Sequence, residues 1–293
     1  MKTDFNRIAV IGGDMRQVYL AEILAQRGYE VSVYALERKT EHPAIKEKAS
    51  LREALKDTDV LLAPMPFLRA EKLKKAGNVW QKGSFSDLTV ENLLKYAKEG
   101  SLIFAGGISE EFRKQAAEKQ IRCVDYLKNE NIAVQNTVAA AEGMIAEAIC
   151  RSPGNLSRSS CLVLGYGKCG ATLVFCLQKF SCRITVYEKE AKAAARAGII
   201  ADKVAEDSEL PMCLANVQYI FNTIPSIILT ESLLSYVKKG TLILDLASAP
   251  GGVDYNAAGK LGIQAVLLPG LPGKYAPLSS AKILAEAVMR ESE

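Results

Sequence analysis

Histidine is nearly absent from this chain: His42 is the only one among 293 residues. It precedes Pro43 and lies in no glycine turn, a position typical of a solvated loop residue. Because dehydrogenases of 2-hydroxy acids commonly use a histidine to exchange the hydroxyl proton, this scarcity argues against that chemistry. The sequence also contains no nucleophile elbow and no Walker loop, so it gives no support to a hydrolase or a kinase.

Long apolar runs, paired cysteines and blocks of like charge are missing as well. No stretch approaches the roughly 20 apolar residues of a membrane span, and no secretory segment opens the chain, so we expect a cytoplasmic protein that contacts no membrane. The seven cysteines form no CxxC pair, so we expect reduced thiols and no metal site. The net charge of +4 is dispersed, which predicts no nucleic-acid partner but allows a small anionic substrate.

What the sequence does contain is a dinucleotide-binding fingerprint in mid-chain. The apolar run 162–164 opens into a glycine loop that consists of Gly165, Tyr166, Gly167, Lys168, Cys169 and Gly170. In such a motif the first glycine permits a tight turn, the second lets backbone N–H groups approach a pyrophosphate, and the third allows close helix–strand packing. Residues 171–180 are predicted as a helix whose N-terminus faces the phosphates. The alternative is a tight turn that binds nothing.

Glu188 follows the next predicted strand, where a ribose-binding carboxylate is expected. A carboxylate there accepts hydrogen bonds from a ribose 2′-hydroxyl and repels a 2′-phosphate, which favours NAD. Lys189, Lys192 or Arg196 would hold the phosphate of NADP if Glu188 turned away. Both NAD and NADP therefore remain open as the cofactor.

Apolar runs separated by helical patterns predict two parallel sheets. The predicted strands of the first half are residues 7–11, 30–36, 60–63, 102–105 and 122–125. Those of the second half are residues 162–164, 183–187, 219–222, 242–246 and 264–268. This alternation favours an α/β fold of two Rossmann-like, doubly wound parallel-sheet domains with a cleft between them.

The domain boundary is predicted in the polar stretch 152–160, where serine, proline and glycine interrupt the helical pattern. A helix over about 131–150 precedes it, and another over about 279–290 is expected to cross back to the first half. The predicted parts are an N-terminal substrate and catalytic domain at 1–130, a connecting helix and linker at 131–155, an NAD(P)-binding domain at 156–275 and a C-terminal helix at 276–293.

Loops rich in glycine, proline and polar residues follow the last three predicted strands, where open α/β sheets bind ligands. We expect these loops to contribute cofactor contacts. The residues concerned are Thr223, Pro225, Ala247, Ser248, Pro269 and Leu271.

Five motifs, in this order, resemble one family. They are GGDMRQ at 12–17, Asn136-Thr137 with Glu142-Gly143, the glycine loop, the segment 245–254 and the segment 269–277. Together they resemble the family of dipicolinate synthase A subunits over nearly the whole chain. The resemblance implies a dehydrogenase subunit in the mother cell of a sporulating bacterium, working with a flavoprotein-like B subunit. It implies oxidation of 4-hydroxy-tetrahydrodipicolinate, a lysine-pathway precursor, or of its dehydrated dihydro form, to pyridine-2,6-dicarboxylate.

Several residues are candidates for binding and converting that dicarboxylate. Arg16 offers a planar fork for a carboxylate, and the N–H groups of Gly12 and Gly13, next to Gln17, form a small-anion nest. Lys274, after Gly273, is expected to reach the second carboxylate or polarise the ring. Asn136 and Thr137 would orient the substrate or the nicotinamide, and Asp14 and Glu142 are the carboxylates available as bases. Each of these residues could instead have a structural role, as a helix cap or as an exposed surface residue.

Two other functions remain open. One is an amino-acid or hydroxy-acid dehydrogenase of the alanine dehydrogenase type, and the other is a non-catalytic, nucleotide-sensing subunit. We also expect a homo-oligomer.

Overall fold

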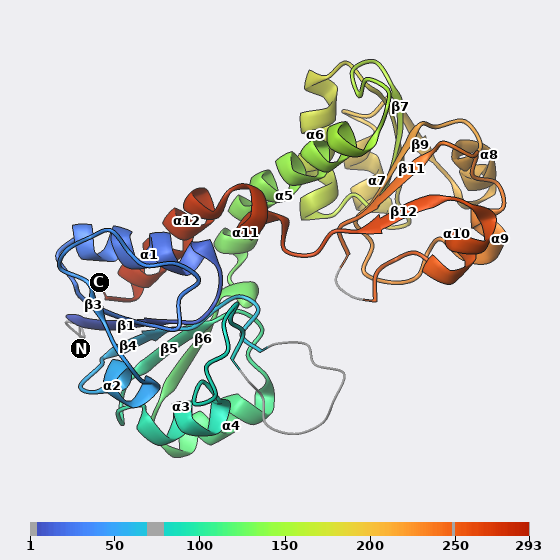
Figure 1. The fold of residues 1–293 in the computed structure, drawn as a ribbon. Coiled ribbons are helices and arrows are strands. Elements are labelled where there is room, and N and C mark those ends of the chain that lie inside the picture. The colour runs from blue at the N-terminus through green and yellow to red at the C-terminus, as the bar shows by residue number, and fades with distance from the viewer. Residues whose placement is uncertain (1–4, 69–78, 248–249, 293) are drawn as a thin grey trace. The chain divides into compact units, whose positions relative to one another are not determined.

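The computed structural model describes residues 5–68, 79–247 and 250–292 (Figure 1). The chain divides into two compact units. Unit 1 comprises Met1–Gln135 and Ala276–Glu293, and unit 2 comprises Asn136–Tyr275. Within the described ranges, no helix combines the length and apolar character needed to cross a membrane.

Unit 1 is built on a six-stranded parallel sheet in the order β3-β2-β1-β4-β5-β6. Its strands are β1 (Arg7–Ile11), β2 (Glu30–Tyr34), β3 (Lys46–Glu47), β4 (Val60–Leu62), β5 (Leu102–Ala105) and β6 (Arg122–Asp125). Its helices are α1 (Met15–Gln26), α2 (Leu51–Leu55), α3 (Val90–Tyr96), α4 (Glu110–Glu118), the 3₁₀ helix η1 (Tyr126–Lys128) and α12 (Pro277–Ser292). The strand order reverses between β1 and β4, which is the switch point where open α/β sheets bind ligands.

Helices cover both faces of this sheet (Figure 1). Successive strand residues point to opposite faces, so Ile8 and Val10 join a core with α1 and α12, whereas Ala9 and Ile11 join a core with α2, α3 and α4. Burial on both faces explains why the central strands are continuous apolar runs.

Unit 2 repeats the plan with the strand order β12-β11-β10-β7-β8-β9, again all parallel. Its strands are β7 (Ser160–Leu164), β8 (Arg183–Tyr187), β9 (Lys203–Ala205), β10 (Tyr219–Asn222), β11 (Leu242–Asp245) and β12 (Gln264–Leu267). Its helices are α6 (Lys168–Lys179), α7 (Ala191–Ala197), η2 (Asp207–Glu209), α8 (Leu210–Leu214), α9 (Glu231–Leu234), α10 (Tyr255–Leu261) and α11 (Leu271–Tyr275), with α5 (Glu130–Arg151) entering from unit 1. The switch point lies between β7 and β10.

The predicted fold class, two Rossmann-like doubly wound sheets, is confirmed. The differences lie at the edges of elements. The edge strands β3 and β9 were not predicted, because runs of two or three residues carry no periodic signal. The second strand ends at Tyr34, two residues early, because Ala35 adopts a φ of 58° that leaves the extended region.

Candidate functional site

The glycine loop, residues 165–170, joins β7 to α6 at the switch point of unit 2. Gly165 has a φ of +90°, which glycine adopts without strain, and its N–H donates to the carbonyl of Tyr187 at 2.9 Å. A Cβ added to Gly170 would lie 2.1 Å from the Gly165 carbonyl oxygen, so only a glycine lets the helix pack against the turn. A Cβ added to Gly167 would meet no described atom within 4 Å. The three glycines thus have the geometry that a dinucleotide-binding turn requires.

The N-terminus of α6 lies beside that open space. The helix begins at Lys168, three residues earlier than predicted, because Gly167 adopts the extended conformation of an N-cap. The N-cap residue, Gly167, makes no side-chain capping hydrogen bond, and the first turn contains no acidic residue. Burial raises the pKa of the Cys169 thiol, which therefore stays protonated near neutral pH. The backbone N–H groups of a first helical turn and the positive end of the helix dipole favour an anion here.

Glu188 lies against the same loop. Its Oε2 accepts the N–H of Tyr166 at 2.7 Å, and its Oε1 accepts the N–H of Glu190 at 2.9 Å. A carboxylate has about four acceptor sites, so lone pairs remain for ribose hydroxyls. The ammonium of Lys189 lies 3.2 Å from Oδ2 of Asp207, so it is already paired with another carboxylate.

The loops after β10, β11 and β12 contain the other expected cofactor contacts. Thr223 contacts the start of the glycine loop, because its hydroxyl donates to the Leu164 carbonyl at 3.0 Å and lies 3.4 Å from the Gly165 carbonyl oxygen. Ala247 and Leu271 are buried, whereas Pro225 and Pro269 are exposed. Ser248 lies outside the described residues.

A buried carboxylate, Asp245, holds two of these loops, and the sequence did not single it out. Its Oδ1 accepts from Asn222 Nδ2 at 2.8 Å and from the Ala247 N–H at 2.9 Å. Its Oδ2 accepts from the Gly252 N–H at 2.7 Å and from the Tyr255 hydroxyl at 2.8 Å. Burial and the neighbouring carboxylate raise the pKa of Tyr255, which therefore remains a donor. The network fixes the loops at the carboxyl ends of β10 and β11.

In unit 1, the turn after β1 differs from the expected anion nest. The Gly12 N–H donates to the Tyr34 carbonyl at 3.0 Å, and the Gly13 N–H donates to the Trp80 carbonyl at 2.8 Å. The chain's own carbonyl oxygens therefore take the place expected for a bound carboxylate. Gln17 is fully buried, and its side-chain oxygen accepts the Asp14 N–H at 3.3 Å, which closes a capping box at the start of α1.

Arg16 and Asp14 are engaged with each other. Arg16 is 4% exposed, its Nε and Nη2 each lie 2.9 Å from an oxygen of Asp14, and Nη2 also donates to the Met65 carbonyl. Asp14 also accepts the backbone N–H of Arg16 at 2.9 Å. The expected free cation and free base are thus a buried ion pair in this structure.

The candidates on α5 and α11 lie in unit 2. The side-chain oxygen of Asn136 is buried and has no partner among the described residues, which leaves an acceptor for a ligand donor. Thr137 is buried, and its hydroxyl lies 2.8 Å from that of Thr172. Glu142 is exposed. Gly273 lies within α11, where its N–H donates to the Gly270 carbonyl at 3.1 Å.

Lys274, also on α11, is held by Glu147, a residue that sequence reasoning missed. Oε1 of Glu147 accepts the Lys274 ammonium and, at 2.6 Å, the Tyr275 hydroxyl, while Oε2 accepts Arg151 Nε at 2.6 Å. Burial opposes ionisation of Glu147, but these donors outweigh it and lower its pKa to about 2. One feature of the sequence could have pointed to Glu147: it is an acidic residue three positions after the buried Met144, on a helix face whose other residues are apolar and belong to the core.

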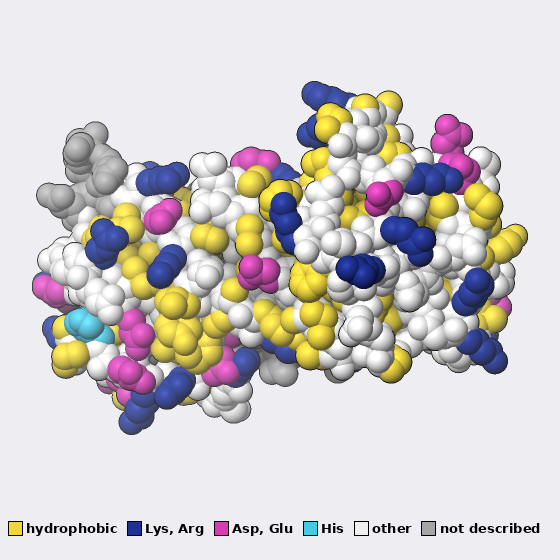
Figure 2. Space-filling model, turned by 90° about the horizontal axis from the view of Figure 1, so that it is seen from above, with side chains coloured by type: hydrophobic (Ala, Val, Ile, Leu, Met, Phe, Trp, Pro, Cys, Tyr) yellow, Lys and Arg dark blue, Asp and Glu magenta, His cyan; other side chains and the backbone are white. Residues whose placement is uncertain are grey.

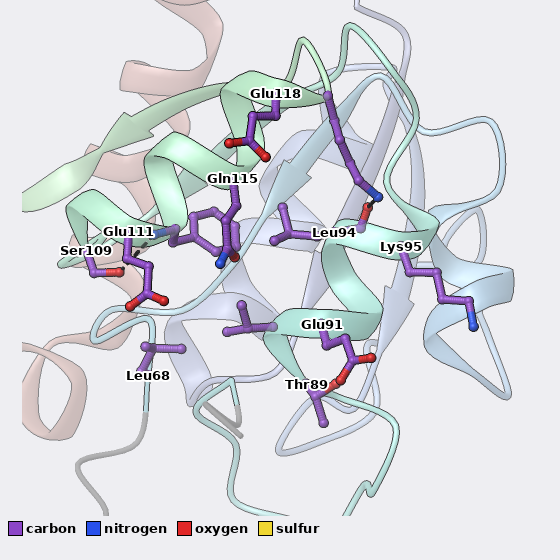
Figure 3. Close-up of a pocket in the computed structure, with 12 residues that line it drawn as sticks. Leu68, Thr89, Glu91, Leu94, Lys95, Ser109, Glu111, Gln115 and Glu118 are labelled. Carbon is purple, nitrogen blue, oxygen red and sulfur yellow. Dashed lines mark hydrogen bonds between the residues drawn. The ribbon is translucent and has the colours of Figure 1, made fainter. Parts of the chain in front are cut away.

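A cavity of about 780 Å³ lies elsewhere, between α3 and α4 of unit 1 (Figure 3). Leu94 and Phe112 contribute apolar surface, and Glu111 and Gln115 extend from α4 beside it. None of its lining residues belongs to either glycine turn or to the loops of unit 2, so it is separate from the predicted site. On the face shown in Figure 2, basic and acidic side chains are interspersed, which agrees with the dispersed charge of the sequence.

Two doubly wound parallel sheets, one with an open glycine turn, define a protein of the dehydrogenase fold. L-alanine dehydrogenase shares it with a TM-score of 0.64 over 97% of this chain and 88% of that chain, and its 12% identity shows the fold alone.

Residues 7–127 match the family model described as the N-terminal domain of the dipicolinate synthase A subunit. The dipicolinate synthase A subunit of Bacillus subtilis (strain 168) is 29% identical over 286 residues, 97% of this chain and 95% of the relative. The crystal structure of the dipicolinate synthase A subunit from Bacillus halodurans is 25% identical, with a TM-score of 0.84 and 98% of both chains covered. The predicted resemblance to the dipicolinate synthase A subunit is therefore confirmed.

Proposed function

We propose that this chain is the dehydrogenase subunit of a dipicolinate synthase and oxidises 4-hydroxy-tetrahydrodipicolinate, with loss of water, or its dihydro form to pyridine-2,6-dicarboxylate. The observation that carries the proposal is the open space at Gly167, the N-cap residue of α6. The similarity to the dipicolinate synthase A subunit supports the substrate. A homo-oligomer and a flavoprotein-like second subunit belong to the same proposal.

The glycine loop and Glu188 would hold a nicotinamide dinucleotide. The pyrophosphate would lie at the first turn of α6, and Glu188 would accept the adenosine ribose hydroxyls through its remaining lone pairs. We favour NAD, because Glu188 would repel a 2′-phosphate; Lys192 and Arg196, exposed on α7, are the cations that NADP would need. When bound, the nicotinamide would supply the hydride acceptor.

The chemistry asks little of the protein beyond positioning. A dihydropyridine dicarboxylate becomes aromatic by losing a hydride and a proton, so the chain itself needs to supply only one proton acceptor. Asp14 is paired with Arg16. Hydrogen bonds to Glu147 and Tyr275 raise the pKa of Lys274 and keep it a cation. We therefore assign the base to Glu142, which is exposed and accepts no hydrogen bond from a described residue.

The substrate's carboxylates need a cation. We favour Lys274 over Arg16 for this role, because the Lys274 side chain is 59% exposed whereas Arg16 is buried in its ion pair.

Titration calorimetry of the purified chain with NAD and with NADP tests the nucleotide site. We expect one of them to bind, and Gly167→Ala to weaken binding at least about tenfold because its methyl group enters the pyrophosphate space. Gly259→Ala is the matched control, since Gly259 on α10 also has open space at its Cβ. Absence of heat with either nucleotide in the wild type would contradict the proposal.

Turnover separates the proposed enzyme from its alternatives. The chain should oxidise the dicarboxylate precursor, by itself or with its partner subunit, and should not couple pyruvate with ammonia. Nucleotide binding without any turnover, even with the partner subunit, would instead identify a sensing subunit.

A further inference from the structure

Glu147 is a buried anion surrounded by partners that extend to solvent. Its side chain is 3% exposed, whereas those of Lys274 and Arg151 are 59% and 36% exposed. Both of its oxygens accept hydrogen bonds, one from Lys274 and Tyr275 and the other from Arg151. Two cations around one carboxylate leave the cluster with a net charge of +1, on the side that water reaches.

The backbone of α11, which carries Lys274, is fixed by a close contact with α5. The contact is at Gly143, one helical turn before Glu147 in the sequence. A Cβ added to Gly143 on α5 would lie 2.9 Å from Cβ of Leu271 and 3.0 Å from the Tyr275 ring, so α11 packs directly on the α5 backbone. Leu271 is 1% exposed and anchors the other end of the short helix. Lys274 therefore starts from a fixed backbone, and only its flexible side chain needs a further restraint.

Glu147 supplies that restraint. A free lysine side chain retains about 2 kcal/mol of rotamer entropy, which it must lose when it binds a ligand in one geometry. A buried, immobile acceptor removes that freedom before the ligand arrives. The ammonium has three protons, and its hydrogen bonds to Glu147 and Tyr275 engage two of them, so one remains for an incoming anion.

We propose that Glu147 is a positioning residue that directs the Lys274 ammonium toward a carboxylate of the substrate. This inference rests on the proposed function, because it takes the ligand to be a dicarboxylate. It gives Lys274 the role of a fixed anion-binding cation. Glu147 acts only through Lys274 and does not touch the substrate.

The test uses the full chain saturated with nucleotide and titrated with pyridine-2,6-dicarboxylate, the stable product of the proposed reaction. The dissociation constant is measured for the wild type, Glu147→Gln, Lys274→Met and the double variant. Glu231→Gln is the control, since it removes an exposed carboxylate from α9 in the same unit. Nucleotide affinity and melting temperature are recorded for every variant.

We expect Glu147→Gln and Lys274→Met each to weaken dicarboxylate binding about tenfold, and the double variant to bind no more weakly than Lys274→Met alone. Nucleotide affinity should stay within about twofold of the wild type, which a general loss of structure in unit 2 would not allow. If Glu147→Gln lowers the melting temperature too far for binding to be measured, Glu147→Asp replaces it. This variant keeps the negative charge but moves it back by one methylene group, and it should weaken dicarboxylate binding while leaving nucleotide affinity unchanged.

The inference is overturned if folded Glu147→Gln binds the dicarboxylate as tightly as the wild type, or if the two losses multiply in the double variant. Failure of the proposed function is a distinct result, because it appears as a wild type that binds neither NAD nor NADP.

Discussion

The two buried carboxylates of unit 2, Glu147 and Asp245, accept hydrogen bonds from different kinds of donor. Glu147 accepts from three charged or ionisable side chains, whereas Asp245 accepts from two backbone N–H groups, an amide and a neutral hydroxyl. A buried carboxylate that loses a donor or its charge leaves other polar groups unsatisfied, so substitutions at these two positions should be costly in different ways.

Glu147 should make unit 2 sensitive to acid. Its pKa is lowered to about 2 in the folded chain, whereas an unfolded glutamate titrates near about 4.3. The resulting stabilisation, about 3 kcal/mol, is therefore fully present above about pH 5 and is lost as the pH falls toward 2. Glu147→Gln should remove this part of the pH dependence, which hydrogen exchange of unit 2 peptides between pH 6 and pH 3 would detect. Equal pH dependence in the variant and the wild type would contradict this, and Glu231→Gln serves as the control.

Asp245→Asn should destabilise unit 2 by about 3 kcal/mol, because the new amide presents N–H groups to donors that the carboxylate had satisfied. Asp254→Asn is the matched control. Asp254 caps α10 through the Ala257 N–H at 3.0 Å, and asparagine caps a helix about as well. The chain's only tryptophan, Trp80, lies in unit 1, so hydrogen exchange of unit 2 peptides is the suitable measurement. Equal protection in both variants would show that the network does not stabilise these loops.

Among the elements, α5 and α11 pack so closely that the residue at position 143 must be a glycine. Gly143 lies in the middle of a helix, where alanine is normally preferred by about 1 kcal/mol. Here a methyl group would collide with Leu271 and Tyr275. The need for close packing explains a glycine that helix propensity alone disfavours.

Gly143→Ala should therefore destabilise the chain by about 1–3 kcal/mol, the usual range for overpacking, while Gly259→Ala should stabilise it by about 0.5–1 kcal/mol. Thermal unfolding followed by circular dichroism measures both. A rise in melting temperature for Gly143→Ala would mean that α11 can shift without loss.

The elements were more predictable than the contacts between them. Strands such as β5 and β10 were found because both faces are covered, which makes them continuous apolar runs. The glycine loop was found because its chemistry lies within six consecutive residues. Glu147 was missed because its partner Lys274 is 127 positions away, and no local pattern tells which loop meets which helix face. The surroundings of Gly12 and Gly13 were not foreseen for the same reason, since the Gly13 N–H donates to the distant Trp80 carbonyl.

At the scale of the whole molecule, unit 1 is assembled from two separate stretches of chain. Helix α12 belongs to it, although all of unit 2 precedes α12 in the sequence. Ala281, Leu284, Ala285 and Val288 of α12 are buried in a core with Leu20 and Leu24 of α1. Unit 2, by contrast, is continuous.

A chain that ends after Tyr275 should lose unit 1 and keep unit 2. Burying each leucine or valine contributes about 1.5–3 kcal/mol, so losing α12 removes a large part of the 5–15 kcal/mol that typically stabilises a domain. Hydrogen exchange should rise in peptides from residues 7–127 and stay unchanged in peptides from 160–245, with nucleotide binding retained. A chain ending at Arg290 is the control, and unchanged protection in unit 1 of the shorter chain would refute the expectation.

The position of α12 also dictates an order of events on the ribosome. Unit 2 can complete its sheet while α12 is still being translated, whereas Leu20 and Leu24 of unit 1 stay exposed to water until α12 covers them. Nascent chains stalled just short of that helix should therefore carry one finished domain and one that a chaperone still recognises.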